Sequence, residues 1–404
     1  MRAHYEKVIC ACCFLVLFTN IGMPSTSFAV YQPYIVAIPD GGDTGGSIIL
    51  GVRAVVTLAV MFVVDRYYRA LDARRGVVLA MACTAAGFVV YGLAQGMPLL
   101  LMGSVLCGLG YGLGGMIAAT MLVSRWFASG IGTAMGVATV GSGVASIIIP
   151  LAAQRIIEAA SLSTAFLCEA ALAFTLMIIV FAFLRNRPSD MGLAPDESKV
   201  KKARAARGGS SKAGLSRPLS RRAHGLLMAA QVATGAFSIG GCAYLSILFV
   251  TEGVDLPTAA LLVSVAGICL TVAKFVMGEI IDRVGTRAAS AIMFAVLIFG
   301  LVACCTVSIG GVPWAAVAAV CTGLGISLGS VGTSVWSIEL SDEEHRTKSI
   351  RDFQIGYAFG GLLMNVLPGP LMTLTGTYVV SFALMGVLTT FAAFVVLRTY
   401  RRYR

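Results

Sequence analysis

The stretch Leu261–Arg287 reads LLVSVAGICLTVAKFVMGEIIDRVGTR and holds about twenty apolar or small residues before its charged end. A bilayer core about 30 Å thick needs roughly twenty residues of helix, so this stretch predicts a membrane-spanning helix. One charge, Lys274, lies inside it. A lysine inside such a helix costs about 2.5–3.5 kcal/mol on insertion scales, and an intramembrane charge usually has a function.

The composition also indicates a membrane protein. Of 404 residues, 58% are hydrophobic and 12% are charged, whereas about 25% are charged in a typical soluble domain. The 46 glycines suit membrane helices, whose backbones approach closely at small residues. The net charge of +11 could suggest nucleic-acid binding. The basic residues lie in short loops between apolar segments, however, so we expect no nucleic-acid partner.

The sequence contains no pattern typical of an enzyme. Its eleven cysteines, an odd number, fall inside apolar segments, which favours buried thiols over a disulfide framework. There are three histidines and no zinc-binding spacing. The glycine runs are not followed by the Lys-Ser/Thr of a phosphate-binding loop. We therefore expect a protein that is not an enzyme and needs no cofactor or metal.

Apolar segments of spanning length occur twelve times and predict an all-α membrane protein with two bundles of six helices. The predicted spans lie at about 8–35, 47–65, 77–93, 99–123, 132–153, 164–184, 224–249, 258–281, 288–308, 313–336, 353–375 and 379–397. The predicted domains are an N-terminal bundle (1–184), a linker (185–222) and a C-terminal bundle (223–404). The linker has eleven Lys/Arg against three acids and is rich in Gly, Ser and Ala, which predicts a flexible segment.

The distribution of basic residues predicts the orientation. With the N-terminus in the cytoplasm, the linker, the basic C-terminal tail and nearly all basic loop residues lie inside, and only Arg155 remains outside. Because cytoplasmic loops carry an excess of Lys and Arg, we expect a multi-pass protein of the plasma (inner) membrane with both termini in the cytoplasm. The oligomeric state stays open, and a monomer is plausible.

The two halves resemble each other. Residues 107–115 read CGLGYGLGG and residues 321–329 read CTGLGISLG, and the second and eighth spans both end in Asp-Arg. Two related six-helix halves are the plan of many secondary transporters, in which the substrate binds between the halves near the middle of the membrane.

The loop after the eighth span resembles the signature of the major facilitator superfamily. Its residues are Gly278, Asp282, Arg283, Gly285 and Arg287, with the superfamily's spacing. The resemblance implies a twelve-helix fold and a loop that latches the cytoplasmic gate through its charges and a helix dipole. The first half keeps only Asp65 and Arg66 of the signature.

A narrower resemblance is to the monocarboxylate and oxalate/formate porters. The segment Trp126-Phe127-x8-Gly136-x-Ala138-x2-Gly141 is similar to their signature between helices 4 and 5, although the basic cluster that follows the aromatic pair there is absent. The resemblance implies that Lys274 holds the carboxylate of the substrate. The acidic partner one turn earlier in animal monocarboxylate carriers is Leu270 in this sequence.

The depth of Lys274 independently supports a role in transport. It lies eight residues before Asp282, which is about 12 Å of helix from the inner boundary. Arg53 is the second intramembrane base, about 9 Å from the outer side by the same rise. Lys274 and Arg53 could line one cavity and favour a small anion. Alternatively, Lys274 could form a structural salt bridge, and Arg53 an outer-gate ion pair or a contact with lipid headgroups.

Other polar residues complete the set of candidates. Glu169 could carry a proton or pair with Arg53, or it could be structural. Aromatic and polar side chains of the first, seventh and eleventh spans could hydrogen-bond the substrate or pack helices together. They are Asn20, Tyr31, Gln231, Tyr244, Gln354 and Tyr357.

The sequence thus predicts a secondary active transporter of a small organic anion, a mono- or dicarboxylate, working by alternating access with proton symport or anion exchange. One alternative is a drug or lipophilic-solute exporter of the same fold, which would prefer acidic cavity residues. Another is a membrane sensor or scaffold that transports nothing, but the linker is too short to form a signalling domain. Substrate, coupling ion and direction of transport stay open.

Overall fold

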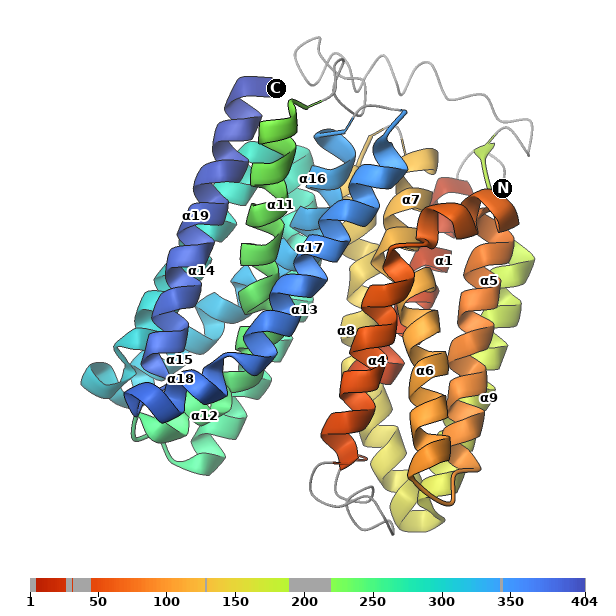
Figure 1. Ribbon diagram of the computed structural model, residues 1–404, viewed down its shortest axis with the longest axis horizontal. Coiled ribbons are helices and arrows are strands. Elements are labelled where there is room, and N and C mark those ends of the chain that lie inside the picture. Colours follow the sequence, from red (N-terminus) through yellow and green to blue (C-terminus); the bar gives the residue numbers. More distant parts are fainter. Residues whose placement is uncertain are drawn as a thin grey trace. The chain divides into compact units, whose positions relative to one another are not determined.

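The computed structural model describes residues 5–26, 31, 45–127, 129–188, 219–341 and 344–403, and within these ranges every regular element is a helix (Figure 1). The chain divides into two compact units. Unit 1 comprises Met1–Ala128 and Val137–Lys202, and unit 2 comprises Ser129–Gly136 and Ala203–Arg404. Residues 189–218 of the predicted linker and most of the loop before residue 45 lie outside the described residues.

Unit 1 is a bundle in which α5 packs against α6 and α9, and α4 packs against α6. Its core contains Phe88, Tyr91 and Phe166. The elements are α1 (Tyr5–Leu17), η2 (Phe18–Gly22), α2 (Met23–Thr26), α4 (Gly45–Met61), α5 (Val64–Gly92), α6 (Met97–Gly114), α7 (Met116–Trp126), α8 (Ile131–Ala159) and α9 (Leu162–Phe183).

Unit 2 is a second helical bundle. In it α11 packs against α17 and α19, and α14 packs against α15 and α19. The elements are α11 (Arg221–Gly235), η4 (Ala236–Gly240), η5 (Gly241–Tyr244), α12 (Leu245–Thr251), α13 (Leu256–Val284), α14 (Thr286–Cys305), α15 (Val307–Gly325), η6 (Leu328–Gly332), α16 (Thr333–Glu339), α17 (Arg346–Val366), α18 (Pro368–Thr375) and α19 (Val379–Tyr403).

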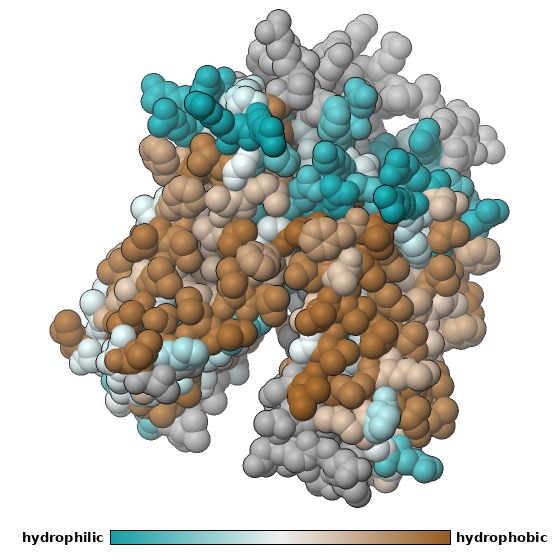
Figure 2. Space-filling model, viewed as in Figure 1, coloured by the Kyte–Doolittle hydropathy of each residue, from teal (hydrophilic) through white to brown (hydrophobic). Residues whose placement is uncertain are grey.

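The helices have the length and composition of membrane spans. Within the described ranges, nine helical stretches can cross a bilayer, and a bent pair from α11 to α12 makes a tenth. The second expected span contains the shorter apolar stretch Ile48–Met61 of α4. Residues 353–375, the eleventh expected span, lie in α17 and α18. Large apolar side chains cover much of the surface of each unit (Figure 2), as expected where hydrocarbon replaces water as the solvent. Each of the twelve predicted spans thus contains described helix, and residues 27–30 and 32–35 of the first predicted span lie outside the described residues.

Several boundaries differ from the sequence-based expectation. The predicted loop after the second span is helical, because α5 begins at Val64 and continues to Gly92 with one break at Asp72, whose φ is 59°. The predicted tail after residue 397 is also helical, since α19 continues to Tyr403. Both segments are rich in charged residues that favour helix, and hydropathy alone does not detect a helix that leaves the apolar layer.

Corresponding spans of the two halves are interrupted. The first span contains the π-helical segment η2, and the seventh contains η4. The fourth span breaks at Gly115, between α6 and α7, and the tenth contains η6 between α15 and α16. Such π-helical segments frequently occur at functional sites, so these interrupted spans are candidates for forming the functional site.

Candidate functional site

Lys274 is the central candidate of unit 2. Its side chain is 8% exposed, whereas Ile268, Val272 and Phe275 of the same helix are exposed. These three apolar residues follow the i, i+4, i+7 spacing of one helix face, and Lys274 lies on the other side of α13. The helix therefore presents its apolar face outward and keeps the amine buried, as the cost of a charge in hydrocarbon requires.

Two glycines explain how α13 meets the start of α8, whose first residues belong to unit 2. A Cβ at Gly132 would lie 2.6 Å from the carbonyl oxygen of Gly278, and a Cβ at Gly136 would lie 2.7 Å from that of Lys274. Both distances are too short for a real Cβ contact. Two glycines that resembled family signatures, Gly136 and Gly278, are thus positions where two helix backbones touch.

The signature loop caps the start of α8. The carboxylate of Asp282 accepts hydrogen bonds from the backbone N–H of Gly132 (3.2 Å) and of Thr133 (2.7 Å). Glu279 accepts from the Thr133 hydroxyl at 3.2 Å and from Arg283 Nε at 2.8 Å. The first N–H groups of a helix have no partner within the helix and carry partial positive charge. The carboxylate of Asp282 supplies both a hydrogen-bond acceptor and a negative charge at this helix end.

The other signature residues lie between helices or in the first turn of a helix. Gly285 separates α13 from α14 with a φ of 90°, a conformation that glycine adopts without strain. Arg287 lies exposed in the first turn of α14. In the first half, Asp65 lies in the first turn of α5 and Arg66 is exposed.

Two buried amides lie on α11 and α17. Gln231 is 0% exposed and Gln354 is 3% exposed. The Thr333 hydroxyl of α16 donates to Gln231 Oε1 at 2.9 Å. In the described part of the chain, Nε2 of either glutamine has no hydrogen-bond partner. A buried donor without a partner costs about 1–3 kcal/mol, so these amides are candidates for binding a ligand that accepts hydrogen bonds.

The tyrosines of unit 2 lie at different depths. A Cβ at Gly329 would collide with the hydroxyl of Tyr357, which places that ring beside η6. Tyr357 therefore lies in the same region of α17 as Gln354. Tyr244 lies thirteen residues beyond Gln231, and its hydroxyl donates to the backbone oxygen of Asn365 at 2.6 Å. Gln231, Gln354 and Tyr357 thus lie where α11 packs against α17, whereas Tyr244 contacts the C-terminal end of α17.

An acid is buried in unit 1. Glu169 of α9 is 5% exposed and accepts a short hydrogen bond from the hydroxyl of Tyr31. The Tyr31 ring packs 4.2 Å from that of Phe166, centre to centre. The second carboxylate oxygen of Glu169 has no partner among the described residues. A buried carboxyl group with one oxygen left without a partner in the described part of the chain is a candidate for binding a proton.

Arg53 and Asn20 have different environments in unit 1. Arg53 is half-buried on α4, and its NH1 has no partner within the described ranges. Asn20 is fully buried in η2. Its Nδ2 donates to Gly114 O at 3.1 Å, and its Oδ1 accepts from the Thr84 hydroxyl at 2.7 Å. Asn20 therefore holds the interrupted first and fourth spans together.

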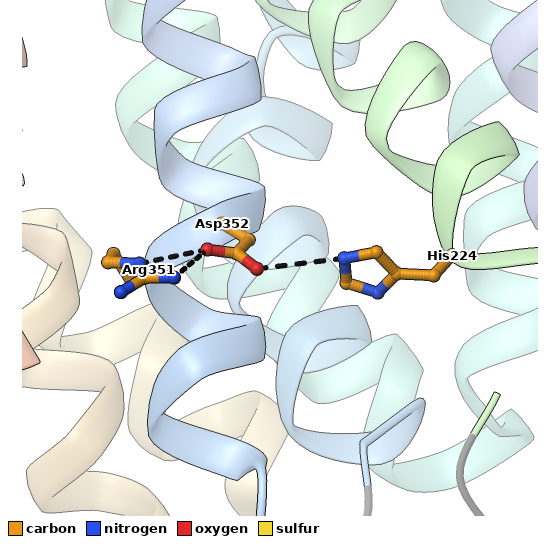
Figure 3. Close-up of polar contacts among 3 residues, drawn as sticks. All are labelled: His224, Arg351 and Asp352. Carbon is orange, nitrogen blue, oxygen red and sulfur yellow. Dashed lines mark hydrogen bonds and ion pairs between the residues drawn. The ribbon is translucent and has the colours of Figure 1, made fainter. Parts of the chain in front are cut away.

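Sequence reasoning missed a charged cluster at the start of α17. Asp352 lies 3.6 Å from His224 Nε2 and 2.8 Å from Arg351 Nε (Figure 3). Burial raises the pKa of Asp352, but hydrogen bonds from His224 and Arg351 outweigh it, and the pKa lies below its ordinary value. A second missed acid is Glu339, which is buried and accepts from the Tyr400 hydroxyl at 3.1 Å. The pairs His224–Asp352 and Glu339–Tyr400 join residues far apart in sequence, so no local pattern indicates them.

Two helical units with apolar surfaces indicate a membrane protein, and interrupted spans with buried ionisable residues are typical of transporters. A family model described as the Major Facilitator Superfamily matches residues 10–257 and 226–404. The chain belongs to this superfamily, whose members are transporters rather than enzymes.

Solved structures share the fold at low sequence identity. The E. coli fucose:proton symporter FucP is 14% identical, with a TM-score of 0.69 and 98% of each chain covered. The proton:xylose symporter XylE is 11% identical, with a TM-score of 0.74 and coverage of 97% of this chain and 94% of its own. The human organic anion transporter MFSD10 is 13% identical, with a TM-score of 0.72 and coverage of 97% and 99%. A comparison with curated proteins found no match.

Proposed function

We propose that the protein is a secondary active transporter of a small organic anion and that a carboxylate is the group it recognises. The observation that carries the proposal is the buried amine of Lys274 on a membrane-spanning helix. A protein retains such a residue, despite its cost, chiefly where it serves a substrate or ion pathway. The narrower resemblance to monocarboxylate and oxalate/formate porters supports the same residue for the same task.

The polar surroundings suit an acceptor-rich substrate. Gln231 and Gln354 each keep an N–H donor without a partner in the described part of unit 2. A carboxylate has two oxygens that accept such hydrogen bonds, and a charged acceptor makes them stronger. Arg53 is a second base, on unit 1, that could serve a second carboxylate of the substrate.

Proton coupling would use Glu169. Its burial and its hydrogen bond with Tyr31 allow the carboxyl group to bind and release a proton during transport. Anion exchange would leave this proton in place. The solved structures named above include two proton:sugar symporters and an organic anion transporter. The fold therefore accommodates both sugars and organic anions, and the choice between these substrates depends on the buried residues.

Asp282 would control the inner gate. Its hydrogen bonds to Gly132 and Thr133 tie the start of α8 to the end of α13, and breaking them would free α8 to move. We place this loop, both termini and the linker on the cytoplasmic side of the plasma membrane. Nearly all basic loop residues then lie in the cytoplasm, where membrane proteins carry an excess of Lys and Arg.

Counterflow in proteoliposomes tests the proposal. Labelled mono- and dicarboxylates and, separately, hexoses would be offered to wild type, Lys274→Gln and Lys348→Gln. Lys348 is an exposed lysine in the first turn of α17 and is the matched control. We expect saturable carboxylate exchange that Lys274→Gln reduces about 10–100-fold, because a hydrogen bond to a charged group contributes about 1.5–3 kcal/mol. Wild-type exchange in Lys274→Gln, or transport of hexoses alone, would overturn the proposal.

A further inference from the structure

An open pocket with four arginines lies at one end of unit 2. Its volume is about 630 Å³, and its walls come from the end of α19 and the start of α14. The basic residues are Arg287, Arg398, Arg401 and Arg402, and the apolar residues are Phe394 and Leu397. All four arginines are exposed. This pocket is separate from the proposed transport site. Its residues lie at the basic end of α19 and the start of α14, whereas Lys274 lies within the span of α13.

The arginines repel one another. Arg398 and Arg402 are separated by four residues on one helix, a spacing at which like charges destabilise a helix. Across the described ranges, none of the four has an ion pair with an acid. Glu339, the acid that reaches this end of α19, is buried and accepts from Tyr400. The cluster therefore lacks a counter-charge from the described protein and is complementary to an anion.

The pocket continues into an apolar face. Val387, Phe391 and Phe394 are exposed along α19, and Ile292 is exposed on the neighbouring α14. Val387 lies seven residues before Phe394, about 10 Å further along the helix. The guanidinium of Arg398 stacks over the Phe394 ring at 5.6 Å. A ligand here would meet cations at one end and hydrocarbon-facing side chains at the other.

We propose that this pocket binds the headgroup of an anionic phospholipid, with the acyl chains along α19 and α14. The phosphodiester accepts the forked hydrogen bonds that arginine donates. Basic pockets at the cytoplasmic ends of membrane helices suit such headgroups, because the cytoplasmic leaflet is the anionic one. The inference uses the proposed orientation of the chain but not the identity of the transported substrate.

Native mass spectrometry of the detergent-solubilised full chain tests the site. Phosphatidylglycerol is the probe, phosphatidylcholine the zwitterionic control, and sodium phosphate the soluble competitor. The test variant is Arg398→Gln/Arg402→Gln. The control variant Arg221→Gln/Arg222→Gln removes two exposed arginines from the start of α11 and so changes the net charge equally.

We expect wild type and the control variant to retain phosphatidylglycerol over phosphatidylcholine, and the test variant to bind it about 30-fold more weakly, given the contribution of each basic residue near an anionic surface. Equal losses in both variants would show a general charge effect and overturn the proposal. Unchanged binding in the test variant, or full displacement by sodium phosphate, would overturn it too. Because none of these readouts involves transport, failure here leaves the proposed function intact, and failure of carboxylate transport leaves this site intact.

Discussion

The first and seventh spans correspond in the two halves, and each buries an amide in a different way. In unit 1, Asn20 donates to Gly114 and accepts from Thr84. In unit 2, Gln231 accepts from Thr333, while its Nε2 has no partner among the described residues. The difference separates two uses of a buried polar group. Asn20 completes the packing of interrupted helices, whereas Gln231 keeps an N–H donor that could bind the substrate.

The buried charges differ in the same manner. Unit 1 buries the acid Glu169, with a tyrosine as its hydrogen-bond donor. Unit 2 buries the base Lys274 within the span of α13, and its own buried acid, Glu339, is bonded to Tyr400 of α19. The comparison suggests a division of labour, with proton binding in unit 1 and anion binding in unit 2. Four predictions test this comparison.

The largest effect is expected at Glu169. In Glu169→Gln, accumulation of substrate driven by a proton gradient should be lost, because the amide cannot exchange a proton, while counterflow without a gradient continues. Uptake and counterflow in proteoliposomes measure the two activities, and Glu158→Gln, at an exposed acid of α8, is the control. Gradient-driven accumulation at the wild-type level in Glu169→Gln would refute a role in coupling.

The glycines of α13 provide the next test. Gly278→Leu should destabilise unit 2 by about 1–3 kcal/mol or more, because its Cβ would collide with the backbone of Gly132. Gly267→Leu, on the same helix, meets open space and should change stability little. Thermal unfolding in detergent measures both variants, and equal losses would show that the contact of α8 with α13 is unimportant.

The two amides should respond to the same change to different degrees. Asn20→Leu should lower stability by about 1–3 kcal/mol, because it leaves buried partners unsatisfied. Gln231→Leu should cost less, about 1 kcal/mol, since its Nε2 lacks a partner and the Thr333 hydroxyl, which loses its acceptor on Gln231, keeps the backbone oxygen of Leu328 at 3.5 Å. It should nevertheless weaken anion transport. Unfolding and counterflow are measured on each. Stability that falls equally in both variants would mean that Gln231, like Asn20, is purely structural.

The smallest effect is expected at Asp352. Its folded-state pKa lies below the ordinary value, so its contribution to stability is present above the unfolded-state pKa and is lost as pH falls through the folded-state pKa. On acidification below about pH 4, wild type should therefore lose stability more steeply than Asp352→Asn. Unfolding measured across that pH range tests the slope, and parallel curves would contradict the prediction.

Prediction from sequence succeeded for features that depend on the residues of a single helix. The span of α13 and the burial of Lys274 follow from the length of the apolar run and the cost of an exposed charge in hydrocarbon. The helical segment beginning at Val64 was not predicted, because a charged helix at the membrane edge lacks the hydropathy of a span. The roles of Asn20 and Gln231 could not be separated either, because both are simply amides within apolar segments.

The sequence by itself determined the class of the protein: hydropathy, glycine content and the signature loop are local properties that indicate a membrane transporter of this superfamily. The tertiary structure alone decided which polar groups have partners. Asp282 caps a helix that begins some 150 residues earlier, Asn20 reaches Gly114, and Asp352 meets His224. Hydrogen bonds and ion pairs depend on distances of a few ångströms, and only folding brings such distant residues together.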